Sequence, residues 1–355
     1  MTKIKLIQAM GINVQRDNMT YNETIKKQRS LLPKSRNWWP KYFYHFTDIQ
    51  NALGIIDKGW IFGRQTAIEN ELMQNDNASN SVISLSSNGI KEYARLYFRP
   101  KTPTQFHNEG YKPESVRKLD INASCPVPVF FFLDAEKILC MEGIKFSEIS
   151  CAGLSELKLM DGEENFSKLA FDKIYHDSRL DSENRDDIVK HRHAEVVRLG
   201  GIPIKDCLKG IVCRSIAEKQ TLLYILKTQY YEKYIDYQGL IIYNPVLDMF
   251  FNNGMYVKDV RYDGELHILL NDSSKRKIYN CMDAKVKCRI VIDYLDNYEN
   301  VVDRQTHILT VDYLKAEEIN VNVQNAFVGY AVVEVYFDDI LMYKNSVDIS
   351  LDSVI

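Results

Sequence analysis

Apolar residues gather in short stretches that predict a central β-sheet with helices packed on it. Residues 127–133 (VPVFFFL) form a continuous apolar run, which is typical of a strand buried on both faces. Residues 41–46 (KYFYHF) are aromatic and strand-like. The apolar positions from 49 to 56 recur at helical spacing behind Thr47 or Asp48, either of which can cap a helix. This order of elements predicts a mixed α/β unit.

The mixed unit extends to about residue 230. Residues 193–197 (HAEVV) are typical of a β-branched strand with a carboxylate near its start, and residues 211–213 of another short strand. Ser215 and Glu218 then stand at the spacing of a capping box, which opens a helix with leucine and isoleucine on its apolar face.

Alternation with a period of two replaces helical spacing after about residue 230. Asn253-Gly254 and Asp263-Gly264 are hairpin turn pairs, and every second residue from 286 to 292 is apolar or cysteine. This pattern predicts a β-sandwich. We therefore predict an α+β protein with a basic N-terminal arm (1–40), a mixed domain (41–230) and a β-rich, sandwich-like accessory domain (236–355).

Length and composition agree with a folded, two-domain protein. The 355 residues exceed what one core usually serves, and 45% of them are hydrophobic and 26% charged. No apolar run approaches the roughly 18 residues of a membrane span, so we expect no membrane association and a cytoplasmic location. The seven cysteines are scattered without a CxxC pair, which predicts neither a disulfide framework nor a metal site.

The net charge of −3 hides an asymmetry along the chain. Residues 1–41 contain nine Lys or Arg and two acidic residues, whereas residues 296–355 contain eleven acidic residues and three basic ones. The N-terminal part is therefore suited to a polyanion, and the charge of 296–355 counts against nucleic-acid contact there.

The common nucleotide, protease and hydrolase signatures GxGxxG, GxxxxGK, HExxH and GxSxG are absent from the sequence. Three local clusters remain. The first is Tyr44-His45-Phe46-Thr47, at the predicted junction of strand and helix, where imidazole and hydroxyl groups can hold the oxygens of a ligand. The alternative is a strand histidine satisfied inside the core, followed by a helix cap.

The second cluster is the segment 91–118, in which seven Lys or Arg alternate with aromatic residues. Cations that neutralise phosphates, beside rings that stack on bases, are what single-stranded nucleic acid requires. The alternative is a solvated basic face whose aromatic residues point into the core.

The third cluster is Glu195 in HAEVVRL. A carboxylate at the head of an apolar strand can point into a pocket and stabilise positive charge developing on a sugar ring. The alternative is structural pairing with Arg198 or His193.

In this order the three clusters resemble the DarT nucleic-acid ADP-ribosyltransferase toxins, members of the ADP-ribosyltransferase superfamily. The matching segments are 44–61 (YHFTDIQNALGIIDKGWI), 93–110 (YARLYFRPKTPTQFHNEG) and 193–197. Relatives carry a long basic NAD-binding helix before the aromatic strand, whereas the corresponding segment of this sequence, residues 81–91, is short. The resemblance implies an ADP-ribosyltransferase-like split mixed sheet for residues 41–230, which would be the catalytic domain.

The resemblance also implies a function and a site. The enzyme would transfer ADP-ribose from NAD, its co-substrate, to a nucleobase of single-stranded DNA without a metal, as a toxin paired with a protein antitoxin in phage defence. Glu195 would be the catalytic residue. NAD contacts would come from Tyr44, His45, Thr47, Tyr97 and Phe98, and nucleic-acid contacts from Arg95, Arg99, Lys101 and Gln105.

Two alternatives stay open at this point. RNA can replace DNA as the acceptor, because stacking surfaces admit either and the 2′-hydroxyl contact that separates them leaves no sequence signal. The chain can also be a non-catalytic module that binds nucleic acid or protein, in which Glu195 is structural and no NAD is consumed.

Overall fold

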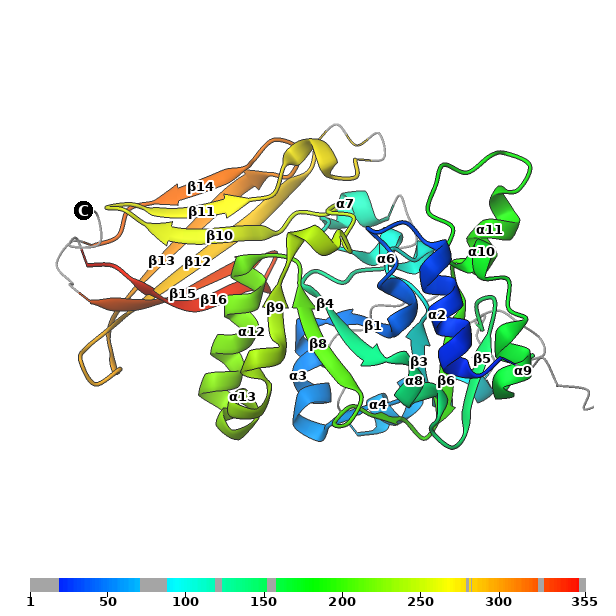
Figure 1. The fold of residues 1–355 in the computed structure, drawn as a ribbon. Coiled ribbons are helices and arrows are strands. Elements are labelled where there is room, and N and C mark those ends of the chain that lie inside the picture. Colours follow the sequence, from blue (N-terminus) through cyan, green and yellow to red (C-terminus); the bar gives the residue numbers. More distant parts are fainter. Residues whose placement is uncertain are drawn as a thin grey trace, which may run out of the picture.

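The computed structural model describes residues 19–70, 88–118, 123–151, 158–278, 281, 283–324 and 329–350. A mixed sheet with surrounding helices forms one half of the molecule, and two smaller sheets form the other (Figure 1). Helix α12 (Ile216–Gln229) lies between the two halves (Figure 1).

Seven strands form the first sheet in the order β5-β6-β3-β1-β4-β8-β9. Neighbouring strands run antiparallel except for β8 and β9, which are parallel. The apolar run of the sequence becomes the nearly fully buried central strand β4, as predicted. The strands are β1 (Tyr42–Asp48), β3 (Tyr93–Tyr97), β4 (Pro128–Asp134), β5 (Ile144–Ser147), β6 (Glu195–Leu199), β8 (Leu208–Cys213) and β9 (Ile241–Tyr243). A separate pair joins β2 (Trp60–Ile61) and β7 (Ile202–Pro203).

Short helices cover this sheet. Asp48, the second of the two possible caps, opens α3 by accepting a hydrogen bond from the Gln50 amide at 3.1 Å. The helices around the sheet are α3 (Ile49–Lys58), α4 (Arg64–Glu69), α6 (Pro103–Asn108), α7 (Glu114–Arg117), α8 (Ala135–Leu139), α9 (Gly162–Ser167), α10 (Phe171–Ile174), α11 (Arg185–His191) and α13 (Tyr231–Tyr237). Short 3₁₀ turns cover Trp39–Lys41, Asn88–Glu92, Gln238–Leu240, Pro245–Leu247 and Ser273–Lys275.

A three-stranded and a four-stranded sheet form the second half, in the orders β10-β11-β14 and β13-β12-β15-β16. Alternate residues of both sheets enter a shared core, so the predicted sandwich is confirmed. The strands are β10 (Val257–Tyr262), β11 (Leu266–Leu270), β12 (Lys285–Leu295), β13 (Val301–Asp312), β14 (Glu318–Val321), β15 (Tyr330–Phe337) and β16 (Ile340–Asp348).

The boundary between the two halves lies later than the sequence analysis placed it. Helix α13 follows residue 230, and β9 then pairs with β8 of the first sheet. Period-two alternation therefore begins only with β10. Most buried apolar residues of both halves also belong to one continuous cluster. Helix α12 joins the halves, because it packs on β8 and β9 of the first sheet and on β10 and β16 of the second half, and its Thr221 Oγ1 accepts the Lys344 amide of β16 at 3.0 Å.

Part of the predicted N-terminal arm is an ordinary helix. Helix α2 (Tyr21–Leu31) begins with a capping box between Thr20 and Glu23. It packs on the first domain through Tyr21, whose ring meets Phe166 edge-on with centroids 5.4 Å apart. Residues 1–18 of the arm lie outside the described residues.

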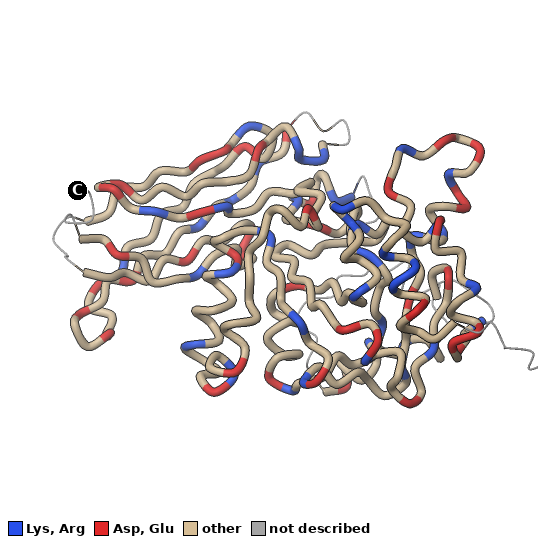
Figure 2. Tube along the Cα trace, viewed as in Figure 1, with Lys and Arg blue, Asp and Glu red and all other residues tan. Residues whose placement is uncertain are grey.

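Charged residues of both signs are interspersed over both halves (Figure 2). None of the helices in the described ranges is long and apolar enough to cross a membrane.

Candidate active site

The first sheet splits between β1 and β3. Only one register pair, Tyr44 with Tyr97, joins the two strands. One residue further along β1, the His45 ring takes the place of a backbone partner, with Nδ1 3.1 Å from the Arg95 carbonyl oxygen. The split therefore leaves a side chain, rather than a backbone ladder, between the two strands.

Glu195 lies on the row of residues that crosses this split. Tyr44, Tyr97 and Glu195 are register partners on β1, β3 and β6, so their side chains share one face of the sheet. The Glu195 side chain is 1% exposed. Strand order thus brings together residues that are about 50 and 100 positions apart in sequence.

Arg95 holds the Glu195 carboxylate. Its Nε donates to Glu195 Oε2 at 3.0 Å, and its Nη2 donates to Oε1. The Cys151 amide adds a third donor, 3.2 Å from Oε2. Burial lowers the pKa of Arg95, but the charge and hydrogen bonds of Glu195, together with the nearby Tyr97 and Cys151, outweigh this effect, and the net shift is upward. The orientation of the carboxylate is therefore fixed by a two-point contact.

Neither of the two partners considered for Glu195 in the sequence analysis pairs with it. Arg198 points to the other face of β6 and donates to the carbonyl oxygens of Glu142 and Gly201, at 2.9 and 2.6 Å. His193 Nδ1 lies 3.3 Å from Thr104 Oγ1. The actual partner comes from β3, because residues two apart on a strand share a face and Arg95 stands two before Tyr97.

A polar chain links the Glu195 row to helix α6. Thr104 forms a side-chain hydrogen bond with Tyr97 and also contacts His193. Burial, followed by the charge of Glu195, raises the pKa of Tyr97. Burial also lowers the pKa of His193. The sequence pattern offers His193 only as a structural partner of Glu195 and does not mark Thr104, since the actual partners of both come from other elements.

His45 is a neutral hydrogen-bonding group. Burial lowers the pKa of His45 to about 4, against a weaker upward effect of its bond to the Arg95 carbonyl. A carbonyl oxygen can only accept, so Nδ1 carries the proton and Nε2 keeps a lone pair. The ring can therefore accept a hydrogen bond from a ligand hydroxyl at Nε2.

The lowered pKa of His45 predicts a pH dependence of stability. The folded state keeps His45 neutral below pH 6.5, while the unfolded chain takes up a proton, so the stabilisation present above pH 6.5 is lost as the pH falls toward about 4. His45→Asn keeps a donor for the carbonyl and does not titrate. Between pH 7.5 and 4.5, the wild type should lose about 2 to 3 kcal/mol more unfolding free energy than this variant in urea titrations. Equal losses would show that His45 titrates normally.

Three of the predicted NAD-contacting residues are packed inside the protein. Tyr44 is 0% exposed and donates its hydroxyl to the Trp39 carbonyl at 3.0 Å. Phe98 is also 0% exposed and packs edge-on against Phe43. Thr47, 4% exposed, shares a strand face with His45. Tyr44 and Phe98 thus have no exposed surface for a ligand, whereas Thr47 keeps a small exposed fraction on the face that it shares with His45.

The basic segment 91–118 is not a solvated patch. Arg99 is 1% exposed, and its guanidinium bonds Asp177 and the His176 carbonyl. Lys112 is 2% exposed and donates to the Glu109 carbonyl at 2.6 Å. Of the residues predicted to contact nucleic acid, Arg99 is therefore buried and Arg95 bonds the Glu195 carboxylate. Lys101 forms an ion pair with Asp248 at 2.7 Å.

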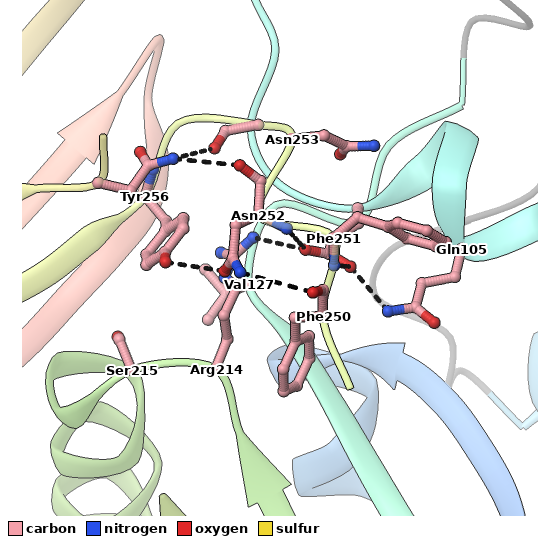
Figure 3. A network of polar contacts seen from close by, with 12 residues as sticks. Gln105, Val127, Arg214, Ser215, Phe250, Phe251, Asn252, Asn253 and Tyr256 are labelled. Carbon is pink, nitrogen blue, oxygen red and sulfur yellow. Dashed lines mark hydrogen bonds and ion pairs between the residues drawn. The ribbon is translucent and has the colours of Figure 1, made fainter. Parts of the chain in front are cut away.

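Gln105, the fourth such residue, belongs to a buried polar network at the junction of the two halves (Figure 3). Its Nε2 donates to Glu109 at 2.7 Å and to the Met249 carbonyl at 2.8 Å. The Glu109 carboxylate also accepts from the amides of Phe251 and Asn252, at 2.9 and 2.7 Å. The segment that enters the second half thus anchors the loop that follows β3.

Arg214 is the cation of this network (Figure 3). It bonds Glu218 through its backbone amide and guanidinium, lies 3.9 Å from Glu109, and stacks 3.9 Å from the centre of the Tyr256 ring. Burial raises the pKa of Glu218 to about 7 although Arg214 opposes the shift. The Arg214 guanidinium is therefore the counter-ion of two buried carboxylates, those of Glu218 and Glu109.

Two glycines let the backbones meet at this junction. A Cβ at Gly110, which has φ of 79°, would lie 2.7 Å from Gly254 Cα, and a Cβ at Gly254 would lie 2.6 Å from the Gly110 carbonyl carbon. Any side chain at either position would push the backbone at Gly110 away from the backbone at Gly254.

A metal is not suggested by the described residues, since no group of three His, Cys, Asp or Glu side chains among them could hold one.

Comparison with known proteins identifies a family. The model described as "ssDNA thymidine ADP-ribosyltransferase, DarT" matches residues 44–241. This range includes Arg95, Tyr97, Thr104, His193 and Glu195, which we call the Glu195 cluster. Comparison with curated proteins gives no match.

Solved structures of DarT proteins are similar to this chain at low identity. Thermus sp. 2.9 DarT in complex with NAD+ is 15% identical, with a TM-score of 0.44 over 60% of this chain and 98% of that one. The same protein in complex with ADP-ribosylated ssDNA is 16% identical, with a TM-score of 0.46 over 60% and 97%. Thermosipho africanus DarTG in complex with ADP-ribose is 15% identical, with a TM-score of 0.43 over 62% and 53%.

Proposed function

Because the chain belongs to the DarT family of ssDNA thymidine ADP-ribosyltransferases, we propose that the Glu195 cluster transfers ADP-ribose from NAD to a thymidine base of single-stranded DNA. The family match confirms the resemblance inferred from the three sequence clusters and makes the chain an NAD-dependent ADP-ribosyltransferase. The observation that carries the residue assignment is the buried Glu195, fixed by Arg95 at the edge of the β1–β3 split.

The residues around the split suit NAD. His45 and Thr47 alternate to the face of β1 opposite Tyr44, so NAD would meet them through the split. His45 offers a neutral acceptor at Nε2 and Thr47 a hydroxyl, both appropriate for ribose oxygens. NAD, when bound, supplies the ADP-ribosyl group and releases nicotinamide. The Glu195 carboxylate would stabilise the positive charge that the ribose carries as that bond breaks.

Arg95 would be a positioning residue for Glu195. Arg95→Lys keeps the positive charge but replaces a rigid two-point contact with a single ammonium. We expect kcat to fall roughly 10- to 100-fold with little change in the KM for NAD, because a carboxylate displaced by about 1 Å loses its alignment. Steady-state kinetics would measure both constants.

Arg198→Lys is the matched control, since Arg198 lies on the neighbouring strand and bonds only carbonyl oxygens among its described partners. If both variants lose activity equally, or if Arg95→Lys changes KM alone, Arg95 does not position the carboxylate.

Single-stranded DNA is the proposed acceptor because a stacked and paired base would first have to be flipped out of a duplex. Labelled NAD should transfer its label to a single-stranded oligonucleotide that contains thymidine. The same oligonucleotide without thymidine, an RNA of matched sequence and a protein pool should stay unlabelled. Labelling of RNA or protein instead of DNA would contradict the proposed substrate, and absence of NAD consumption would contradict the function.

Lys101 remains the proposed phosphate contact among the four predicted nucleic-acid residues, because its side chain is 18% exposed in the loop between β3 and α6. Lys101→Ala should reduce the salt dependence of DNA binding by about 0.7 in log–log slope. Lys168 is an exposed lysine that is also ion-paired, but it lies directly after α9. Lys168→Ala should leave the slope unchanged, and an unchanged slope in both variants would remove Lys101 from the interface.

We also propose that the enzyme is a toxin held in check by a protein antitoxin, with a role in phage defence, as the family resemblance implies. Base modification blocks template use, so expression of the wild type should arrest bacterial growth. Normal growth under wild-type expression, in cells whose DNA is nevertheless modified, would contradict a toxin role.

A further inference from the structure

Helix α6 presents an aromatic ring at the surface. Phe106 is 41% exposed and meets Phe251 edge-on, with ring centroids 5.2 Å apart. The Lys277 ammonium lies 3.6 Å from the centre of the Phe106 ring, and the Lys101 ammonium lies 5.9 Å from the centre of Phe251. We call these four residues the aromatic–lysine patch.

The patch combines three distant segments of the chain. Lys101 and Phe106 belong to the loop and helix after β3. Phe251 belongs to the segment between β9 and β10, and Lys277 to the segment before β12 of the accessory domain. The acidic stretch 296–355 is not part of it.

Asn253 fixes the two central members relative to each other. Its Nδ2 donates to the Phe106 carbonyl at 2.7 Å, and its own carbonyl accepts the Lys277 amide at 2.9 Å. The neighbouring Arg276 is 4% exposed and donates to the carbonyl oxygens of Tyr313 and Ala316, both at 2.7 Å. The backbone that carries Lys277 is therefore held firmly in place.

Helix α6 separates the patch from the Glu195 cluster by only its own width. Thr104 contacts His193, which stands two residues before Glu195. Phe106 stands two residues after Thr104, and residues at that spacing point to nearly opposite sides of a helix. A nucleic-acid strand leaving the site across α6 would therefore meet Phe106.

We propose that the aromatic–lysine patch binds single-stranded DNA next to the nucleotide that occupies the active site, an inference that rests on the proposed function. A neighbouring base stacks on Phe106, and Lys277 moves from the ring to the phosphate. Stacking of a base on an aromatic ring is stronger than an exposed cation–π contact, and the ammonium gains a phosphate, so the exchange favours the bound strand. The accessory domain thereby supplies part of the DNA surface.

Binding of a short, labelled single-stranded oligonucleotide to the full chain without NAD tests this surface. Phe106→Leu keeps an apolar side chain against Phe251 but removes the stacking ring, and affinity should fall about tenfold. Lys277→Gln should lower the salt dependence of binding by about 0.7 in log–log slope. Lys275→Gln, at an exposed lysine two residues earlier, is the matched control and should bind as the wild type does.

The outcomes separate this inference from the proposed function. Wild-type affinity and slope in both variants, together with a lowered unfolding midpoint, would show that the patch only packs the domains together. If Phe106→Leu does not fold, the salt dependence of binding by the Lys277→Gln variant is by itself the test of the patch. A wild type that neither binds single strands nor modifies them overturns the proposed function, whereas a wild type that modifies DNA with no effect of either variant overturns only the patch.

Discussion

Glu195→Gln should lower the rate of ADP-ribosyl transfer by at least about 10²-fold, because the lost negative charge acts on positive charge that exists only in the transition state. Glutamine has nearly the same size and keeps one acceptor oxygen for Arg95, so the fold should persist. Transfer of label from NAD to single-stranded DNA gives the rate, and circular dichroism verifies the fold.

Glu164→Gln is the control for that experiment, since this exposed residue on α9 pairs with Lys168 away from the split. Activity of Glu195→Gln within about tenfold of the wild type would place the catalytic charge elsewhere.

Arg214→Met should destabilise the protein by about 3 to 5 kcal/mol. The change leaves the Glu218 and Glu109 carboxylates buried without their cation, and an uncompensated buried charge is far more costly than the loss of the pair itself. The unfolding midpoint in guanidinium chloride would report the loss.

An exposed pair of similar geometry provides the comparison. Arg304 contacts both oxygens of Asp293, at 2.5 and 2.8 Å, on the surface of β13. Arg304→Met should cost less than about 1 kcal/mol. The double variant Arg214→Met with Glu218→Leu should recover part of the stability. Equal effects at the two arginines would contradict the assignment of a buried network.

Local patterns predicted those parts of the fold that depend on neighbouring residues. The apolar run of β4, the cap of α3, the Ser215 cap of α12 and the alternation of β12 all appear in the structure. The predicted capping box of α12 is only half formed, because the Glu218 carboxylate bonds Arg214 instead of the Ser215 amide. The strand pattern also drew attention to Glu195, because a carboxylate in an apolar strand is unusual, but its catalytic role comes from the family resemblance and stays a prediction. These features need no knowledge of the distant chain.

The partners of the basic residues could not be predicted in the same way. Arg95, Arg99 and Lys101 lie within seven residues, yet they pair with Glu195, Asp177 and Asp248 respectively. Strand alternation alone sends Arg95 toward the site, and tertiary contacts bury Arg99. A cluster of positive charge in sequence therefore says little about a surface until its counter-ions are known.

The place of β9 in the first sheet could not be predicted for a related reason. A three-residue strand, β9, has no periodicity of its own, and it belongs to the first sheet only through its pairing with β8. The roles assigned to the arm, the catalytic domain and the accessory domain stay predictions.

The order in which a ribosome releases the chain gives the anchoring of Glu109 a further consequence. The strands that hold His45, Arg95 and Glu195 emerge first, but the amides that bind the Glu109 carboxylate belong to residues 251 and 252. Until residues 251 and 252 have left the ribosome, Glu109, which anchors the loop that carries Lys101, lacks the amides that bind its carboxylate. A nascent chain thus releases Glu195, the proposed catalytic residue, well before the Lys101 loop, the proposed DNA contact, is complete, so we expect DNA modification to begin only late in translation.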